Sequence, residues 1–174
     1  MAELVEICFR LERSQSPSVV SKKNILVLIG WIVLSFGASA MGIFFPPGDW
    51  YATLNKPSWN PPAWLFGPVW TVLYLMMAVA AWRVWKCGGW EEQRRPLMFF
   101  LAQLLLNALW SPLFFGLHMP GVAFVEILGL LAMIIVTWNA FRSVDKWAAI
   151  LLLPYIAWVS FASVLNVTLW RMNA

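Results

Sequence analysis

Long apolar runs separated by short polar or proline-rich breaks make up most of the chain. No charged side chain occurs from residue 24 to residue 48, and further apolar runs cover about 68–86, 96–115, 121–141 and 147–170. Each run reaches the roughly 20 residues that an α-helix needs to cross the hydrocarbon core of a bilayer. None shows the alternation at every second residue that is typical of membrane β-barrel strands. The pattern therefore predicts an all-α membrane protein, a bundle of five transmembrane helices.

Residues 1–23 have a different pattern, with charged residues scattered among apolar ones and no apolar core followed by a small-residue cleavage site. The segment is therefore not expected to be a signal peptide, and we interpret it as a polar extension, either a short interfacial helix or a disordered tail. Residues 24–174 are expected to form one membrane domain. Its first helix, about 24–45, is expected to stop at Pro46 and Pro47, because proline cannot continue the helical hydrogen bonds.

Tryptophans and prolines concentrate in the connector between the first two runs, from Trp50 to Tyr74. Because proline lacks a backbone N–H and pushes the preceding residue into an extended conformation, the prolines at 57, 61 and 62 predict a non-helical segment over residues 56–63. Pro68 is expected in the first turn of the second helix, where its missing N–H costs nothing. We expect this rigid connector to cap a cavity and to present indole rings to it.

The charge distribution predicts how the helices are oriented. Only 11% of the residues are charged and 61% are hydrophobic, with a mean hydropathy of +0.73, which is too apolar for a soluble domain. Of the twelve cations, only Lys56 and Arg171 fall on one side of the expected bundle. Cytoplasmic flanks of membrane helices are rich in Lys and Arg, so the N-terminus is predicted to be cytoplasmic. The same rule accounts for the net charge of +4, and no nucleic-acid partner is expected.

The chain carries few residues suited to classical catalysis or metal binding. Its one histidine, His118, falls in the turn expected between the third and fourth helices, and its two cysteines are Cys8 and Cys87. These residues predict neither a metal site nor a Ser/His/Asp triad. Both cysteines fall on the side that the charges mark as cytoplasmic, where disulfides are rare, so free thiols are expected.

Polar side chains are rare inside the expected spans. Gln103, Asn107 and Trp110 recur at the i, i+4, i+7 spacing and so share one face of the third helix. We interpret this face as one that hydrogen-bonds to neighbouring helices. Glu126 lies near the outer end of the fourth helix, and we expect it to bond to a neighbouring helix or to the connector rather than to have a functional role.

Aromatic residues share faces on two of the expected helices. One face of the second helix carries Trp70 and Tyr74, and one face of the fifth carries Tyr155, Trp158, Ala162 and Leu165. Two interpretations are open. These faces are the walls of a pocket, since both tryptophans have small or polar neighbours, or they belong to the aromatic belts that membrane proteins carry at their interfaces.

Three segments of the chain resemble those of a known membrane family. They are NKPSWNPPAWLFGPVWTVLY at residues 55–74, LNALWSPLFFG at 106–116 and PYIAWVSFASVLNVTLWR at 154–171. All are similar to the tryptophan-rich sensory protein and translocator protein family, also called the peripheral benzodiazepine receptor. The resemblance covers about residues 24–173. It implies a five-helix bundle, usually a homodimer, that binds porphyrins such as protoporphyrin IX and haem, together with synthetic benzodiazepine-site ligands.

The function implied by this resemblance is that of a membrane receptor, sensor or transporter whose porphyrin ligand occupies a tryptophan-lined pocket. No obligatory cofactor is implied. Some bacterial members degrade bound protoporphyrin in light and oxygen, which would make Trp70 and Trp158 photochemical residues, so whether the protein is an enzyme stays open. A further alternative is the binding and transport of lipid or sterol, since animal members bind cholesterol. A bacterial membrane is favoured over an organellar outer membrane.

The resemblance also implies particular pocket residues. It places Trp70 and Trp158 as the facing indoles, which suit a flat porphyrin, with Trp110 nearby and Ala162 where bulk alters ligand binding. The family's LNY motif reads Leu165-Asn166-Val167 here, so the tyrosine of the proposed cholesterol-recognition pattern is missing, and that pattern is weak even when complete. The predicted ligand-binding residues are Trp70, Tyr74, Trp110, Tyr155, Trp158, Ala162, Leu165, Asn166 and Lys56, the last as a partner for the porphyrin propionates.

Overall fold

The computed structural model describes residues 22–174, so the predicted polar extension at residues 1–23 lies almost wholly outside the described part of the chain. Five described helices are long and apolar enough to span a membrane, and residues 22–174 contain no strand. The helices are α2 (Lys22–Phe44), α4 (Ala63–Lys86), α5 (Gly89–Ser111), α6 (Pro120–Val144) and α7 (Lys146–Met172). The prediction of an all-α bundle of five transmembrane helices is confirmed.

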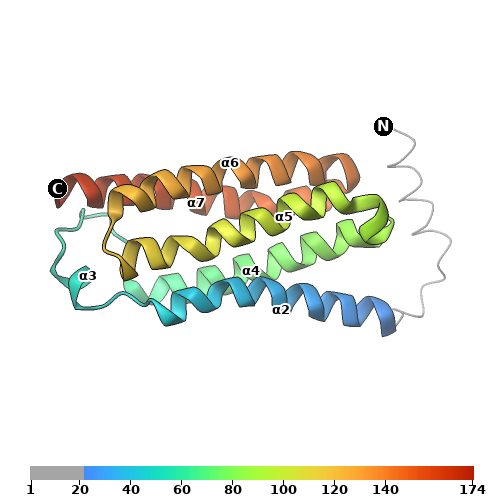
Figure 1. Cartoon of the computed structure of the whole chain (residues 1–174), viewed down its shortest axis with the longest axis horizontal. Helices are drawn as coiled ribbons and strands as arrows, with labels where there is room; N and C mark the ends of the chain where they lie inside the picture. Colours follow the sequence, from blue (N-terminus) through green and yellow to red (C-terminus); the bar gives the residue numbers. More distant parts are fainter. Residues whose placement is uncertain (1–21) are drawn as a thin grey trace.

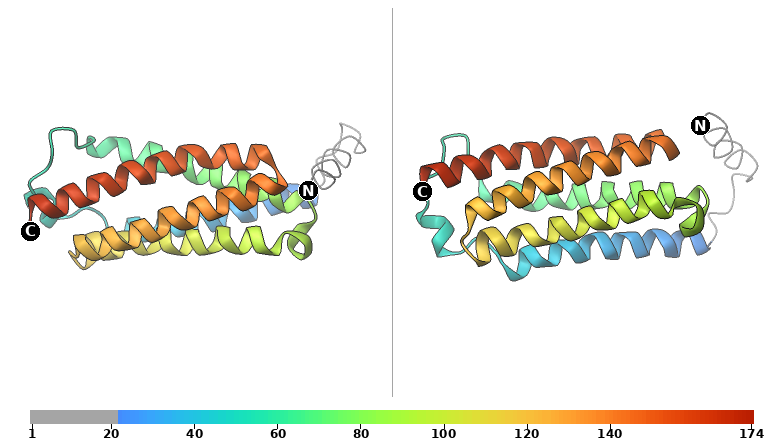
Figure 2. Two further views of the ribbon diagram at one scale, coloured as in Figure 1. Left: turned by 90° about the horizontal axis from the view of Figure 1, so that it is seen from above. Right: turned by 45° about the horizontal axis from the view of Figure 1, so that its top comes forward.

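The five helices lie side by side along the long axis of the molecule (Figure 1). Short turns join α4 to α5, α5 to α6 and α6 to α7, so these consecutive helices run antiparallel. Contacts of α2 with α4 and α5, and of α7 with α4 and α6, complete a closed ring in which α5 also contacts α6. The two views of Figure 2 show the connector and the C-terminus at the same end of this ring.

The two ends of the bundle are packed differently. Toward the α4–α5 turn, alanines and large side chains interlock without exposed surface, among them Ala80, Ala81, Leu97 and Phe141. Alanine lets helix backbones approach closely, and van der Waals packing of this kind holds membrane helices together. Toward the connector, the helices instead surround a cavity, described below. The closely packed end therefore fixes the relative positions of the helices that surround the cavity at the other end.

The connector joins α2 to α4 and contains a short helix, α3 (Asp49–Thr53), that the sequence pattern did not predict. Residues 54–62 are non-helical, as the prolines at 57, 61 and 62 predicted. The second spanning helix begins at Ala63 rather than Pro68, because the extended backbone of Pro62 (φ −63°, ψ 144°) already ends the connector. Pro68 consequently lies inside α4, where it removes one backbone hydrogen bond but keeps a helical φ.

The charged segment at residues 91–95, which separates the second and third apolar runs, is part of α5. The helix is interrupted there at Gln93 (φ −104°, ψ 22°), whose side-chain Nε2 donates to the Cys87 carbonyl at 2.7 Å. The turn from α4 to α5 is therefore largely helical, with a kink at Gln93, and is not an irregular loop. After Ser111 the helix continues as a π-helical turn, η1 (Pro112–Gly116).

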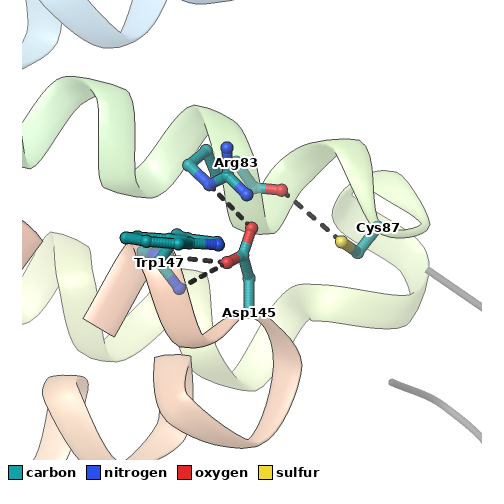
Figure 3. Close-up of polar contacts among 5 residues, drawn as sticks. Arg83, Cys87, Asp145 and Trp147 are labelled. Atoms are coloured by element: carbon teal, nitrogen blue, oxygen red, sulfur yellow. Dashed lines mark hydrogen bonds and ion pairs between the residues drawn. The ribbon is translucent and has the colours of Figure 1, made fainter. Parts of the chain in front are cut away.

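Asp145 organises the turn between α6 and α7. One carboxylate oxygen accepts hydrogen bonds from the backbone N–H groups of Trp147 (2.7 Å) and Ala148 (3.1 Å), which makes Asp145 the N-cap of α7. The other oxygen lies 2.8 Å from Nε of Arg83 on α4. Figure 3 shows the carboxylate between the two helices that it joins.

Cys87 is disulfide-bonded, so the expectation of a free thiol at this position is wrong. Cys8 lies outside the described residues. The expectation rested on the cytoplasmic side that the charge pattern indicates for this residue. The side of the membrane does not determine which side chains come into contact in the fold. Because a disulfide sulfur has no proton, the 3.6 Å approach of Cys87 Sγ to the Arg83 carbonyl, drawn in Figure 3, is a contact rather than a hydrogen bond.

Candidate ligand-binding cavity

A cavity of about 730 Å³ lies beneath the connector and is lined by side chains of all five spanning helices. Pockets of roughly 300–1,000 Å³ are typical of sites that enclose a small organic ligand. On α2 the lining residues are small, including Ala38 and Gly42, so this wall lies back from the centre. The connector contributes the roof, where Tyr51 and Lys56 line the cavity.

Eight of the nine predicted ligand-binding residues line this cavity: Lys56, Trp70, Tyr74, Trp110, Trp158, Ala162, Leu165 and Asn166. Tyr155 does not line it. Its side chain is fully buried, and its ring lies behind Trp70 with 6.2 Å between the ring centroids. Helical spacing places Tyr155 on the same side of α7 as Trp158, but the helix face turns into the core one turn below the cavity.

Two tryptophans on neighbouring helices, one on α4 and one on α7, form walls of the cavity and contact other aromatic rings. Trp70 stacks on Tyr74 with 5.4 Å between the centroids and 28° between the planes. Trp158 makes an edge contact with Phe66 at 5.8 Å and a tilted contact with Phe161 at 5.6 Å. Within residues 22–174, neither indole N–H has a hydrogen-bond partner, so each is available to an acceptor on a ligand.

Trp110 has a different environment. Its Nε1 donates to Oδ1 of Asn166 at 3.0 Å, and Nδ2 of Asn166 donates to the Pro120 carbonyl at 2.8 Å. The indole also stacks on Phe114, with 4.9 Å between the ring centroids and 19° between the planes. This chain of contacts joins α5, α6 and α7, so Trp110 is a fixed wall of the cavity.

A buried hydrogen-bond chain forms the floor. The Tyr74 hydroxyl donates to Oδ1 of Asn107 at 2.5 Å, and Nδ2 of Asn107 donates to the Tyr155 hydroxyl at 3.0 Å. The predicted interhelical bonding of the face that carries Asn107 and Trp110 is confirmed. Gln103 makes only a weak contact, from Nε2 to the Met77 sulfur at 3.9 Å. The chain ties α4, α5 and α7 together directly below the cavity.

The roof carries the cavity's charge. Lys56 is the one charged residue among the described lining residues, and its Nζ donates to the carbonyls of Ala52 (3.3 Å) and Leu54 (3.2 Å). The ammonium also lies 4.7 Å from the centre of the Tyr51 ring. Burial raises the pKa of the Tyr51 phenol, which donates to Asn60 Oδ1 at 3.3 Å. The roof therefore presents one cation beside a neutral phenol.

Two contacts that the sequence did not reveal hold the connector against the bundle. The side chain of Asn173, just after α7, accepts from the Asn55 N–H at 2.8 Å and donates to the Asn55 carbonyl at 3.0 Å. At the other end of the connector, Trp50 stacks on His118 with 4.3 Å between the ring centroids. His118 has φ +54°, unusual for a residue with a side chain. A separation of 118 residues between Asn55 and Asn173 leaves no local sequence signal of their pairing.

Glu126 is an ionisable residue inside the spanning helices, on α6. Both carboxyl oxygens of Glu126 are buried without a hydrogen-bond partner in the described part of the chain, so the expected bond to a helix or to the connector is not formed. Residues 22–174 hold no cluster of His, Cys, Asp and Glu suited to a metal ion. The lining of the cavity is mostly apolar, with Lys56 as its one charged residue within the described part of the chain.

Fold and site together define a class of protein: a membrane bundle of five spanning helices that encloses a largely apolar cavity under a proline-rich connector. The family described as TspO/MBR matches residues 24–171. The chain is 45% identical over 156 residues to the tryptophan-rich protein TspO of Chlorobaculum tepidum, covering 87% of this chain and 98% of that protein. It is 44% identical over 150 residues to the translocator protein of Ovis aries, covering 83% and 89%. The chain belongs to the TspO/MBR family.

Proposed function

We propose that the protein is a receptor, sensor or carrier that binds a porphyrin in the cavity. The observation that carries this proposal is the pairing of two indoles that have no hydrogen-bond partner within residues 22–174, Trp70 and Trp158, with the single cation among the described lining residues, Lys56. A porphyrin is a flat apolar plate with two propionates on one edge. Stacking on an indole contributes roughly 0.5–1.5 kcal/mol beyond the area that it buries.

Lys56 matches the anionic edge of such a ligand. Its ammonium group bonds to neutral carbonyl oxygens, and a carboxylate acceptor forms a shorter and stronger charge-assisted bond. The plate would then lie between the aromatic walls with its propionates at the roof. Replacement of Lys56 by Ala is expected to weaken binding of protoporphyrin IX more than binding of its uncharged dimethyl ester. Equal losses for both ligands would contradict the role of Lys56.

The test is a dark titration of the purified protein with protoporphyrin IX, followed by quenching of tryptophan fluorescence. A Trp70→Phe, Trp158→Phe double variant is expected to bind at least several-fold more weakly. The matched control is the Trp138→Phe, Trp147→Phe double variant, because both residues lie outside the cavity lining, toward the α6–α7 turn. No saturable binding to the wild type, or equal affinity for both double variants, would refute the proposal.

Two alternative functions are separated by extending the same titration. Illumination in oxygen, with loss of the porphyrin spectrum that depends on Trp70 and Trp158, would assign a degradative activity. Dark binding without such loss would leave a sensor or a carrier. If a sterol or phospholipid displaces the porphyrin at a comparable concentration, lipid handling becomes the leading function, because the same apolar walls suit an apolar chain.

A further inference from the structure

A second hollow lies on the outside of the bundle between α4 and α7, with a volume of about 570 Å³. We call it the α4–α7 groove. Its lining is apolar and includes Pro68 and Val72 of α4 and Pro154 and Ala157 of α7. Val72 is 55% exposed, and both helices belong to the spanning set. The groove therefore opens toward the hydrocarbon region of the bilayer and not toward water.

Trp158 lines both the groove and the ligand-binding cavity. Its neighbour Phe66 lines the cavity, while its other ring neighbour, Phe161, lines the groove. The indole is therefore the partition between the two spaces. A hydrogen bond fixes the indole of Trp110, but none within residues 22–174 fixes that of Trp158. Rotation of this one side chain would join the groove to the cavity.

Two prolines and an alanine lie beside the groove, next to Trp158. Proline lacks the N–H that would bond to the carbonyl four residues earlier, so Pro68 and Pro154 each loosen their helix beside the groove. Ala157 offers only a methyl group where a larger residue would fill the groove. Meanwhile the connector covers the polar end of the cavity, and Asn173 bonds to it at Asn55. On the side of the groove, the residue shared by the two spaces is thus Trp158.

We propose that the α4–α7 groove is a lateral entrance, gated by Trp158, through which an apolar ligand reaches the cavity from the hydrocarbon core of the membrane. The ligand class is a flat or chain-like apolar molecule that partitions into the bilayer. It enters with its apolar edge leading, and any anionic group stays near the interface, where Lys56 lies. For a porphyrin this entrance rests on the proposed function, but the entrance itself is testable without that ligand.

The ligand-free test places a cysteine at Ala162, which lines the cavity and not the groove. In vesicles, labelling of the Ala162→Cys variant by a long-chain N-alkyl maleimide is measured above the background of the parent chain. Ala157→Trp, which plugs the groove from α7, is expected to slow labelling roughly tenfold, the effect of about 1.4 kcal/mol on a barrier. Ala132→Trp, at an exposed position on α6 away from the groove, is the matched control and is expected to leave the rate unchanged.

Equal labelling rates with Ala157→Trp and Ala132→Trp would overturn the proposal. Val72→Trp plugs the same groove from α4, so the test does not depend on the folding of one variant. With protoporphyrin IX in the same vesicles, the plug is expected to lower the association and dissociation rates by the same factor and to leave Kd unchanged. A wild type that shows groove-dependent labelling but no porphyrin binding would refute the proposed function and keep the entrance.

Discussion

The contact between Asn173 and the connector gives the sharpest prediction of how the roof of the cavity is held. Asn173→Ala removes the acceptor for the Asn55 N–H (2.8 Å) and the donor to the Asn55 carbonyl (3.0 Å). It also removes a bond from Nδ2 to the Leu169 carbonyl (2.8 Å), which stays within the end of α7. Only the first two bonds cross from the helix to the connector, so only they hold the roof.

Both crossing bonds are exposed, so each belongs at the low end of the range for hydrogen bonds, about 0.5 kcal/mol. Together they contribute about 1 kcal/mol, which is roughly a fivefold change in the equilibrium between the held and released connector. Asn173→Asp keeps the acceptor for the Asn55 N–H but loses the donor. It is therefore expected to give about half of this free-energy change.

Hydrogen exchange of the Asn55 amide measures this equilibrium, because local opening limits exchange. Asn173→Ala is expected to accelerate exchange about fivefold, while Asn139→Ala, an exposed change on α6, leaves it at the wild-type rate. If the ligand uses the lateral entrance, its release rate stays unchanged in Asn173→Ala. Unaltered Asn55 exchange in that variant would refute the assignment of Asn173 as the contact that holds the roof.

Three further predictions concern the bundle and the connector. Asp145→Ala removes two interactions: the N-cap of α7, which contributes about 1 kcal/mol, and the partly buried ion pair with Arg83, which contributes up to about 1 kcal/mol. Asp145→Asn keeps the cap and loses only the ion pair, so it is expected to destabilise the protein less. Equilibrium unfolding in mixed micelles should rank them in that order; equal losses would contradict it. Tyr155→Phe leaves Nδ2 of Asn107 without its acceptor and is expected to cost about 0.5–1.5 kcal/mol in the same assay, with no loss contradicting the role of the floor chain. Burial raises the pKa of the Tyr51 phenol, so the folded state favours the neutral phenol; this contribution to stability is complete below the ordinary pKa of about 10 and is lost as the pH rises above it. Tyr51→Phe is therefore expected to flatten the fall in unfolding free energy at alkaline pH, and an unchanged fall would contradict this.

The spans were predictable because a bilayer imposes a simple rule on length and polarity. The five apolar runs became five helices, and the prolines of the connector kept residues 54–62 out of a helix. The ends were less predictable, because capping depends on contacts made in three dimensions. The helix α4 begins after Pro62 and not at Pro68, and the charged residues 91–95 belong to α5, which is kinked at Gln93 where that side chain bonds to the Cys87 carbonyl.

The cavity was predictable to the extent that helical spacing and the family resemblance determine which residues share a face. Those two arguments together brought Trp70, Trp110 and Trp158 to one cavity, but spacing also placed Tyr155 there, since it cannot tell the depth at which a face turns into the core. The pairing of Asn173 with Asn55 and the unpartnered carboxyl of Glu126 are products of tertiary packing. No local pattern of residues predicts either feature.

Hydrogen bonding distinguishes Trp82 and Trp110 from the cavity residues Trp70 and Trp158. Trp82 donates to the Asn24 carbonyl at 3.0 Å and Trp110 donates to Asn166, so these indoles join helices and are fixed by that task. Trp70 and Trp158 line the cavity without such a partner in the described chain. An indole N–H without an acceptor in the protein can donate to an acceptor on a bound molecule. Among the three tryptophans that line the cavity, Trp70 and Trp158 are therefore the two whose N–H groups can still bond to an enclosed molecule, and Trp158 also lines the α4–α7 groove.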